Sequence, residues 1–221
     1  MKLVINAAIK FLLGFFFVAL LLFLPAGSFS YWNAALLLCL LFIPIFSLGL
    51  VLLLKAPSLL EKRLNGKEKE GAQKGVVAAA GLIFLCGFVV AGLDFRFAWS
   101  QVPLWVVVLA SVILLLSYGF YARVMRENAY LSRVVEVREG QKVVSTGLYG
   151  VIRHPMYAAT LILFLSIPLV LGSLWSLLCF FLYVPVIVIR ILNEEKVLLR
   201  SLEGYDAYRK KVKYRLIPYI W

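Results

Sequence analysis

Long apolar runs separated by short polar segments make up most of this chain. A membrane crossing needs roughly 20 apolar residues, and the first four runs are long enough. The last two are shorter and are joined by LGSLW, which predicts a helical hairpin that either crosses fully or dips in and returns. The pattern predicts an all-α, polytopic transmembrane protein with about six membrane segments. The runs cover residues 3–24, 31–54, 76–93, 103–122, 156–171 and 174–192.

The first apolar run also has the form of a signal peptide, because the residues PAGS follow it at 25–28. A second long run begins at residue 31, directly after this short connection. We therefore expect a retained first helix rather than a cleaved leader.

Basic residues are distributed unevenly between the connections. Six Lys or Arg fall between Lys55 and Lys74, six fall between Arg123 and Arg153, and seven follow Glu195. The opposite connections carry a single arginine. Under the positive-inside rule this predicts six crossings, with both termini and the polar segments in the cytoplasm. The aromatic residues expected to form a belt at the opposite surface are Tyr31, Trp32, Trp99, Trp105 and Trp175.

Composition supports the membrane assignment, since 63% of the 221 residues are hydrophobic and 15% are charged. The net charge of +12 lies in short segments between apolar runs, so we attribute it to topology and anionic lipids, not to nucleic acid. The three cysteines lie inside apolar runs without a CxxC pair and are expected to be inert. We expect one integrated membrane domain, with N-terminal helices at 1–122 and the functional region at 123–221.

Three cytosolic segments are candidates for a site, at 64–75, 136–157 and 190–221. The first has mixed charge and three glycines, which is typical of a solvated loop. The other two carry more specific information.

The only histidine stands between an arginine and a proline in the stretch GLYGVIRHPMY. Proline disfavours a helical conformation at the preceding residue and suits the first turn of a helix, so His154 is expected at the lip of a helix that begins at Pro155. The N–H groups of Met156 and Tyr157 lack intrahelical partners there, which predicts an anion site suited to a carboxylate. The alternative is that His154 only caps the helix and Arg153 only anchors lipid headgroups.

A second charged group ends the last apolar run. Glu194 follows Arg190 at i+4 on the same helix face, with Glu195 beside it. Ionised groups at a membrane boundary are costly unless they are paired or functional. They form either a structural ion pair or, together with residues 147–157, a cytosolic pocket for a zwitterionic ligand.

Other chemistries lack the residues they need. One histidine without a cysteine in a polar segment cannot supply a zinc site, and two adjacent glutamates make a poor di-iron site, so no metal is expected. The chain has no GxxxxGK[ST] and no strand-linked GxGxxG motif. Ser145 lies near His154 in sequence, but no acidic residue is placed to orient a catalytic triad.

The stretches TGLYGVIRHPMY, RILNEEKVLL and YDAYRKKVKYRLIPYIW, in this order, resemble the C-terminal half of the isoprenylcysteine carboxyl methyltransferase and phospholipid methyltransferase group of integral membrane enzymes. The likeness covers residues 136–221. It implies S-adenosyl-L-methionine as methyl donor, bound on the cytosolic side. It also implies a lipophilic acceptor from the bilayer, either the carboxylate of an isoprenylcysteine-like substrate or a lipid amine.

Carried over residue by residue, the resemblance implies a set of site residues. Arg190, Glu194 and Glu195 would be catalytic. Ala158 stands where the family usually has glycine, which bears on helix packing and on the identity of the acceptor. The cofactor would be bound by Gln141, Lys142, Val143, Val144, Tyr149, His154, Pro155, Met156, Tyr157, Arg190 and Glu194.

The implied cofactor suits these side chains chemically. Its carboxylate suits Arg190 or the helix start, its ammonium suits Glu194, and its sulfonium suits an aromatic face such as Tyr149. A carboxylate acceptor is ionised at neutral pH and needs no base, whereas an ammonium must first lose a proton, for example to Glu195 or His154. This difference favours a carboxylate acceptor.

Two alternatives stay open. Membrane sterol and enone reductases that use NADPH share an RHPxY-like stretch and a similar C-terminus, but they usually have asparagine before the tyrosine, where this chain has Met156. A small membrane transporter would carry ionisable residues in mid-span, whereas here they cluster at the cytosolic ends.

Overall fold

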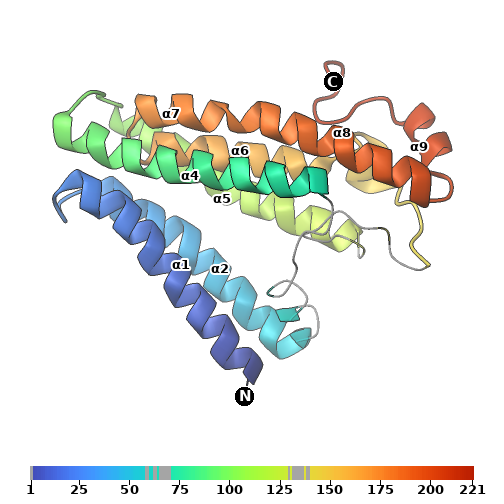
Figure 1. Ribbon diagram of the computed structural model, residues 1–221, viewed down its shortest axis with the longest axis horizontal. Coiled ribbons are helices and arrows are strands. Elements are labelled where there is room, and N and C mark those ends of the chain that lie inside the picture. Colours follow the sequence, from blue (N-terminus) through green and yellow to red (C-terminus); the bar gives the residue numbers. More distant parts are fainter. Residues whose placement is uncertain are drawn as a thin grey trace.

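The computed structural model describes residues 2–57, 60, 61, 64, 71–128, 130, 137 and 140–221, and within these ranges every regular element is a helix (Figure 1). This confirms the predicted all-α fold. The first half of the chain contains α1 (Lys2–Ala26), α2 (Trp32–Lys55), α4 (Gly71–Phe97) and α5 (Leu104–Glu127). The second half contains the 3₁₀ turn η1 (Gly147–Gly150), α6 (Pro155–Val170), α7 (Leu174–Phe181), α8 (Tyr183–Ser201) and α9 (Tyr205–Lys211).

Among the described residues, five helical segments are long and apolar enough to cross a membrane: α1, α2, α4, α5 and the nearly continuous pair α7–α8. The helix α6 is apolar but has only 16 residues, which span about 24 Å at 1.5 Å per residue. The chain is an integral membrane protein. Residue 122, where the predicted functional region follows the N-terminal helices, lies inside α5.

The helix α8 continues well past the end of the last apolar run at residue 192. Residues 193–201, NEEKVLLRS, are helical because Glu, Lys, Leu and Arg are good helix formers. The amide of Leu202 then caps the helix through the carbonyl of Leu198. The extension places Glu194 and Glu195 on a rigid helix instead of in a loop.

The turns after α1, α4 and α6 meet at one end of the bundle. Tyr31 Oη donates a hydrogen bond to the carbonyl of Leu171 at 2.7 Å, and the Asn33 side chain donates to the carbonyl of Val170 at 2.8 Å. These bonds place the end of α6 at the same end of the bundle as the turns after α1 and α4. From this shared end, α1 and α2 diverge from the bundle formed by α4 to α8 (Figure 1).

Tyr31 does not belong to an aromatic belt, contrary to the prediction. It is buried and its ring stacks on Phe95 with centroids 4.3 Å apart. The four tryptophans of the predicted belt are exposed at the bundle surface: Trp32, Trp99, Trp105 and Trp175.

Candidate functional site

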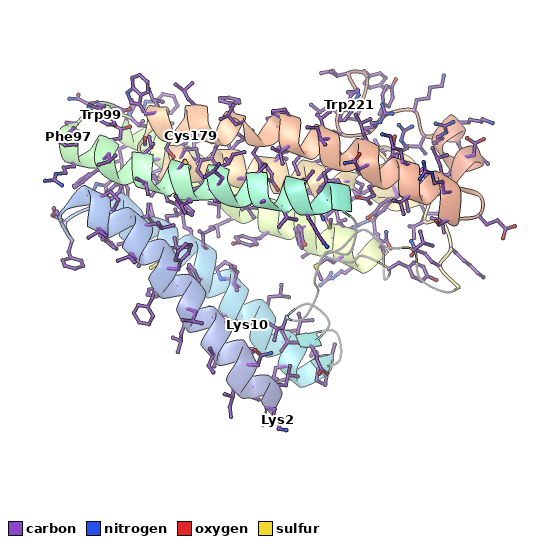
Figure 2. The ribbon with its side chains drawn as sticks, in the orientation of Figure 1. Lys2, Lys10, Phe97, Trp99, Cys179 and Trp221 are labelled. Carbon is purple, nitrogen blue, oxygen red and sulfur yellow. The ribbon has the colours of Figure 1, made fainter. Side chains whose placement is uncertain are left out.

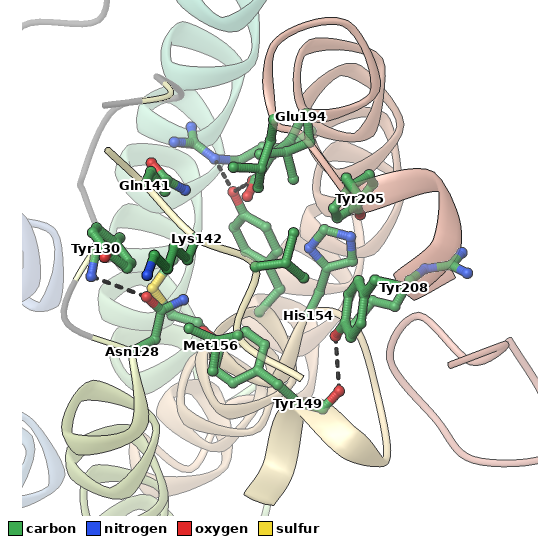
Figure 3. Close-up of a pocket in the computed structure, with 17 residues that line it drawn as sticks. Asn128, Tyr130, Gln141, Lys142, Tyr149, His154, Met156, Glu194, Tyr205 and Tyr208 are labelled. Atoms are coloured by element: carbon green, nitrogen blue, oxygen red, sulfur yellow. Dashed lines mark hydrogen bonds between the residues drawn. The ribbon is translucent and has the colours of Figure 1, made fainter. Parts of the chain in front are cut away.

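A polar pocket lies at the opposite end of the bundle from the three turns, where η1, α8 and α9 meet (Figure 3). Segments far apart in the sequence contribute its walls: the end of α5, the irregular stretch after residue 140, the start of α6, and the last turns of α8. The lining residues are Asn128, Tyr130, Gln141, Lys142, Val143, Val144, Tyr149, Arg153, His154, Met156, Tyr157, Arg190, Glu194, Leu198, Leu202, Tyr205 and Tyr208.

The structure brings most of the predicted cofactor residues to this one cavity. Gln141 to Val144, Tyr149, His154, Met156, Tyr157, Arg190 and Glu194 all line it. Pro155 does not; it is buried and begins α6. Glu195, predicted to be catalytic, lies outside the lining.

The backbone around His154 follows the expectation from the proline. His154 has φ −126° and ψ 58°, outside the helical region, and its side chain makes no capping hydrogen bond. The prediction that Tyr157 offers a free N–H to an anion is wrong, because this N–H donates to the His154 carbonyl at 3.1 Å. A 3₁₀-type bond thus tightens the first turn of α6 and leaves less of an anion site there.

A chain of three side chains crosses the pocket between α6 and α8. Arg190 Nε donates to Tyr157 Oη at 2.9 Å, and this hydroxyl in turn donates to Glu194 Oε2. The Arg190 guanidinium also lies 5.9 Å from the centroid of the Tyr157 ring. The predicted i, i+4 neighbours are therefore joined through a tyrosine hydroxyl, which fixes a cation and an anion at one wall of the cavity.

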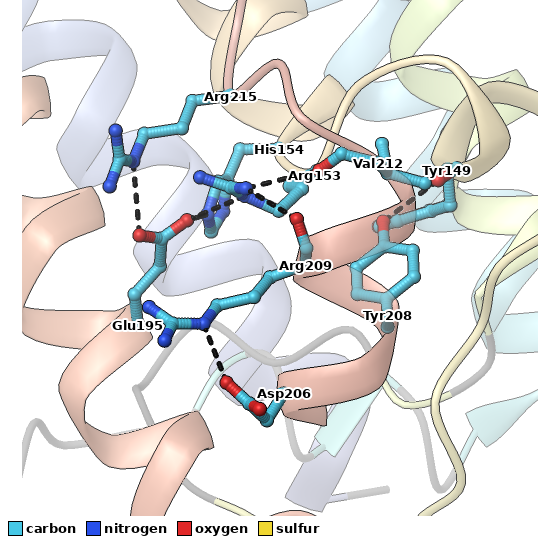
Figure 4. A network of polar contacts seen from close by, with 9 residues as sticks. All are labelled: Tyr149, Arg153, His154, Glu195, Asp206, Tyr208, Arg209, Val212 and Arg215. Atoms are coloured by element: carbon cyan, nitrogen blue, oxygen red, sulfur yellow. Dashed lines mark hydrogen bonds and ion pairs between the residues drawn. The ribbon is translucent and has the colours of Figure 1, made fainter. Parts of the chain in front are cut away.

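Glu195 occupies a separate network behind the pocket (Figure 4). One carboxylate oxygen accepts from Arg153 Nε at 2.8 Å and lies 3.2 Å from His154 Nε2. The other oxygen accepts from Arg215 Nε at 3.0 Å. The side chains of Glu195 and Arg153 are each only 6% exposed, so this is a buried ion pair. The residues of this network come from α8, from the turn just before α6 and from the C-terminal tail. The network therefore holds these three segments together.

Two tyrosines of α9 line the pocket, and sequence reasoning missed them. Tyr208 Oη donates to the Tyr149 carbonyl at 2.8 Å, whereas Tyr205 Oη is buried and has no hydrogen-bond partner among the described residues. Burial, and secondarily the nearby Glu195 charge, raises the pKa of Tyr205, so its hydroxyl stays protonated at neutral pH. The i, i+3 spacing in YDAYRKK would have placed both rings on one helix face.

Residues 105–203 match the model of the phospholipid methyltransferase family. The match confirms the resemblance to the isoprenylcysteine carboxyl methyltransferase and phospholipid methyltransferase group. Because this is a family of methyltransferases, the match supports an enzymatic function. A comparison with curated proteins gives no significant match.

The matched segment contains the pocket residues of α6 and α8 but ends before α9. Tyr205, Tyr208 and Arg215 therefore lie outside the matched region. The family match and the structure both assign pocket residues to α6 and α8. The contribution of the residues after α8 is seen in the structure alone.

An apolar groove of about 770 Å³ adjoins the polar pocket. It lies between the diverging helices α1 and α2 and the inner faces of α4, α5, α6 and α8, and its walls include Phe42 and Phe84. Met156, Tyr157 and Arg190 line both the groove and the polar pocket. The two spaces meet at these three residues.

Proposed function

We propose that this protein is an integral membrane methyltransferase that uses S-adenosyl-L-methionine and methylates a lipophilic acceptor. The observation that carries the proposal is the junction of a charged, tyrosine-lined pocket with an apolar groove at Met156, Tyr157 and Arg190. When bound, S-adenosyl-L-methionine supplies a methyl group that is already activated for transfer.

The residues present fit this cofactor. Arg190 suits its carboxylate and Glu194 its ammonium, and both line the same cavity. The aromatic ring of Tyr149 suits a sulfonium. Tyr205 supplies the most specific support, because a buried hydroxyl without a partner costs about 1–3 kcal/mol, and a polar group of the cofactor would satisfy it.

Orientation is the main task of the protein side chains in this reaction. The bonds from Arg190 to Tyr157 and from Tyr157 to Glu194 hold the cation and anion in fixed positions, which reduces the entropy lost on binding. We assign Glu195 a positioning role instead of a catalytic one, because it binds Arg153, His154 and Arg215 of the chain itself.

The same network favours a carboxylate acceptor, such as an isoprenylcysteine-like substrate, over a lipid amine. A protonated amine must lose a proton before it attacks a methyl group. The two groups expected to accept that proton, Glu195 and His154, already lie 3.2 Å apart and share Arg153 as a neighbour. An ionised carboxylate needs neither of them.

The apolar groove provides the acceptor with a route from the bilayer to the pocket. Its walls are mainly aliphatic and aromatic, and they belong to the apolar helix α6 and to helices that are long and apolar enough to span a membrane. A lipid tail could lie along the groove while its polar head reaches Arg190 and Tyr157.

We place the pocket and both chain termini on the cytosolic side. Along the sequence the basic segments follow α2, α5 and α8, whereas the segments that follow α1, α4 and α6 contain no Lys or Arg, apart from Arg96 in the last turn of α4. Cysteine labelling in intact cells should modify Glu203→Cys only after permeabilisation. Labelling from outside would reverse this orientation.

Isothermal titration of the purified protein with S-adenosylmethionine, S-adenosylhomocysteine and NADPH tests the cofactor. We expect binding of both adenosyl compounds at about 1 μM to 1 mM, the range of typical enzyme substrates. Transfer of a labelled methyl group into a lipid fraction would then identify the acceptor class. Saturable NADPH binding without S-adenosylhomocysteine binding would replace the proposal with a reductase, and absence of binding by all three would favour a transporter.

A further inference from the structure

The end of the chain, Tyr214–Trp221, forms a closed loop that the proposed reaction does not use. The N–H groups of Arg215, Leu216 and Ile217 all donate to the Trp221 carbonyl, at 2.8, 2.9 and 3.1 Å. The Trp221 N–H donates back to the Ile217 carbonyl at 3.1 Å. Five backbone N–H groups of the loop, those of Arg215, Leu216, Ile217, Ile220 and Trp221, thus donate to carbonyls within the loop.

This loop turns back along the bundle from α9 toward the membrane-spanning part of the helices. Leu216 and Trp221 pack in one apolar cluster with Leu161 of α6 and with Ile187 and Ile191 of α8. Figure 2 shows Trp221 beside the bundle, set back from the end where α9 lies. The loop therefore lies beside the apolar turns of α6 and α8, although it follows a strongly basic segment.

The tip of the loop presents apolar side chains outward. Ile217 is 52% exposed, Tyr219 is 88% exposed and Ile220 is 76% exposed. Apolar area left in water costs about 25 cal/mol per Å² relative to burial, and contiguous exposed patches of this kind mark contacts with membranes or partners.

The charges next to the tip favour a lipid surface as the occupant. Lys211 and Lys213 are exposed just before the loop, while Arg209 and Lys210 pair with Asp206. A basic residue near an anionic membrane surface contributes roughly 1 kcal/mol. Along the bundle, the basic residues lie nearer the end with α9, and the apolar tip lies nearer the middle of the helices. This order matches that of headgroups and acyl chains in a leaflet.

We propose that Tyr214–Trp221 is a re-entrant loop whose tip, Ile217–Ile220, lies in the leaflet beside the pocket, with Lys211 and Lys213 among anionic headgroups. Backbone inserted into lipid must satisfy its polar groups internally, and the carbonyls of Ile217 and Trp221 accept five N–H groups within the loop. Arg215 belongs to the loop and binds Glu195 at 3.0 Å. Insertion of the tip therefore fixes the tail, and with it the wall of the pocket, relative to the membrane.

Depth measurements on labelled protein test the loop directly. In a variant with Cys39, Cys86 and Cys179 replaced by alanine, Ile220→Cys carries an environment-sensitive fluorophore, and Glu203→Cys, exposed on the turn after α8, is the matched control. Both are placed in nanodiscs of phosphatidylcholine and phosphatidylglycerol. We expect blue-shifted emission and quenching by acyl-chain nitroxide lipids at 220, and quenching by aqueous iodide at 203.

A second position and a charge variant sharpen the outcome. Ile217→Cys should behave like Ile220→Cys, and the pair Lys211→Glu and Lys213→Glu should weaken lipid quenching at 220 in discs that contain phosphatidylglycerol. Labels at 217 and 220 quenched by iodide as strongly as the label at 203 would overturn the proposal and would assign the tip to a water-soluble partner. Unchanged quenching in the charge variant would overturn the part of the proposal that places the lysines among anionic headgroups.

Discussion

The two ends of the bundle each bury a carboxylate, but they surround it differently. Asp94, 2% exposed, accepts from the N–H and hydroxyl of Ser100 at 2.7 and 2.6 Å and from the hydroxyl of Ser173 at 2.5 Å. Glu195, 5% exposed, is bound by two arginines and lies beside His154. The first carboxylate ties turns together with neutral donors, and the second ties a charged pocket to the tail.

The two clusters also differ in whether their buried polar groups all have hydrogen-bond partners. Around Asp94, Ser173 and Ser100 also complete their own bonds, since Ser173 Oγ accepts from the Ser176 N–H and Ser100 Oγ accepts from the Leu174 N–H. Near Glu195, the hydroxyl of Tyr205 has no partner among the described residues. A satisfied buried cluster is typical of a structural role, and an unsatisfied buried donor beside a cavity indicates a ligand.

The largest effect is expected from Glu195→Ala. This change leaves the Arg153 guanidinium buried without its counterion, which should lower the free energy of unfolding by about 3–5 kcal/mol. It should also weaken S-adenosylhomocysteine binding, because the tail loses its attachment to α8. Denaturant unfolding in detergent micelles measures the change. The exposed control Glu203→Ala should shift stability by about 0.5 kcal/mol or less, and an equally small effect at Glu195 would contradict the network.

At the opposite end, Asp94→Ala should cost about 1–3 kcal/mol of stability, because the hydroxyls of Ser100 and Ser173 lose their buried acceptor. Cofactor affinity should stay unchanged, since this end of the bundle contributes nothing to the pocket lining. The same unfolding assay and a titration with S-adenosylhomocysteine check both parts. A large loss of affinity would show that the two ends are coupled.

Tyr205→Phe should separate binding from stability. Removing an unpartnered hydroxyl should leave apo stability unchanged or slightly higher, while loss of one hydrogen bond to the cofactor should weaken S-adenosylhomocysteine binding by about tenfold, or 1.4 kcal/mol. Unaltered affinity would mean that Tyr205 does not contact the ligand.

The smallest of these expected effects is at Tyr208. This residue lies on α9 like Tyr205, but its hydroxyl has a hydrogen-bond partner. Tyr208→Phe removes the bond to the Tyr149 carbonyl and should lower apo stability by about 0.5–1.5 kcal/mol. Thermal melting of the two tyrosine variants side by side gives the contrast. Equal melting temperatures would remove the distinction between a structural and a ligand-binding tyrosine.

The helices were predictable from the sequence because apolar runs of membrane length leave few alternatives. The convergence of Arg190, Glu194 and His154 was also predicted from the charged residues at the ends of two apolar runs, and the family resemblance added the identity of the ligand. The role of Glu195 was not, because adjacent residues on a helix point about 100° apart and only the fold shows which one faces the cavity. The buried state of Tyr31 and the contribution of Tyr205 depend on contacts between distant segments, which no local pattern encodes.

The most direct test of the cofactor site is the affinity of Glu194→Gln for S-adenosylhomocysteine. The substitution keeps the size of the side chain and removes the charge that would meet the ammonium of the ligand. We expect the affinity to fall by about tenfold or more, with the apo melting temperature nearly unchanged, whereas Glu203→Gln should leave both unchanged. Wild-type affinity combined with a lowered melting temperature in Glu194→Gln would contradict the account, because it would show that Glu194 serves only to hold Tyr157 and Arg190 in place.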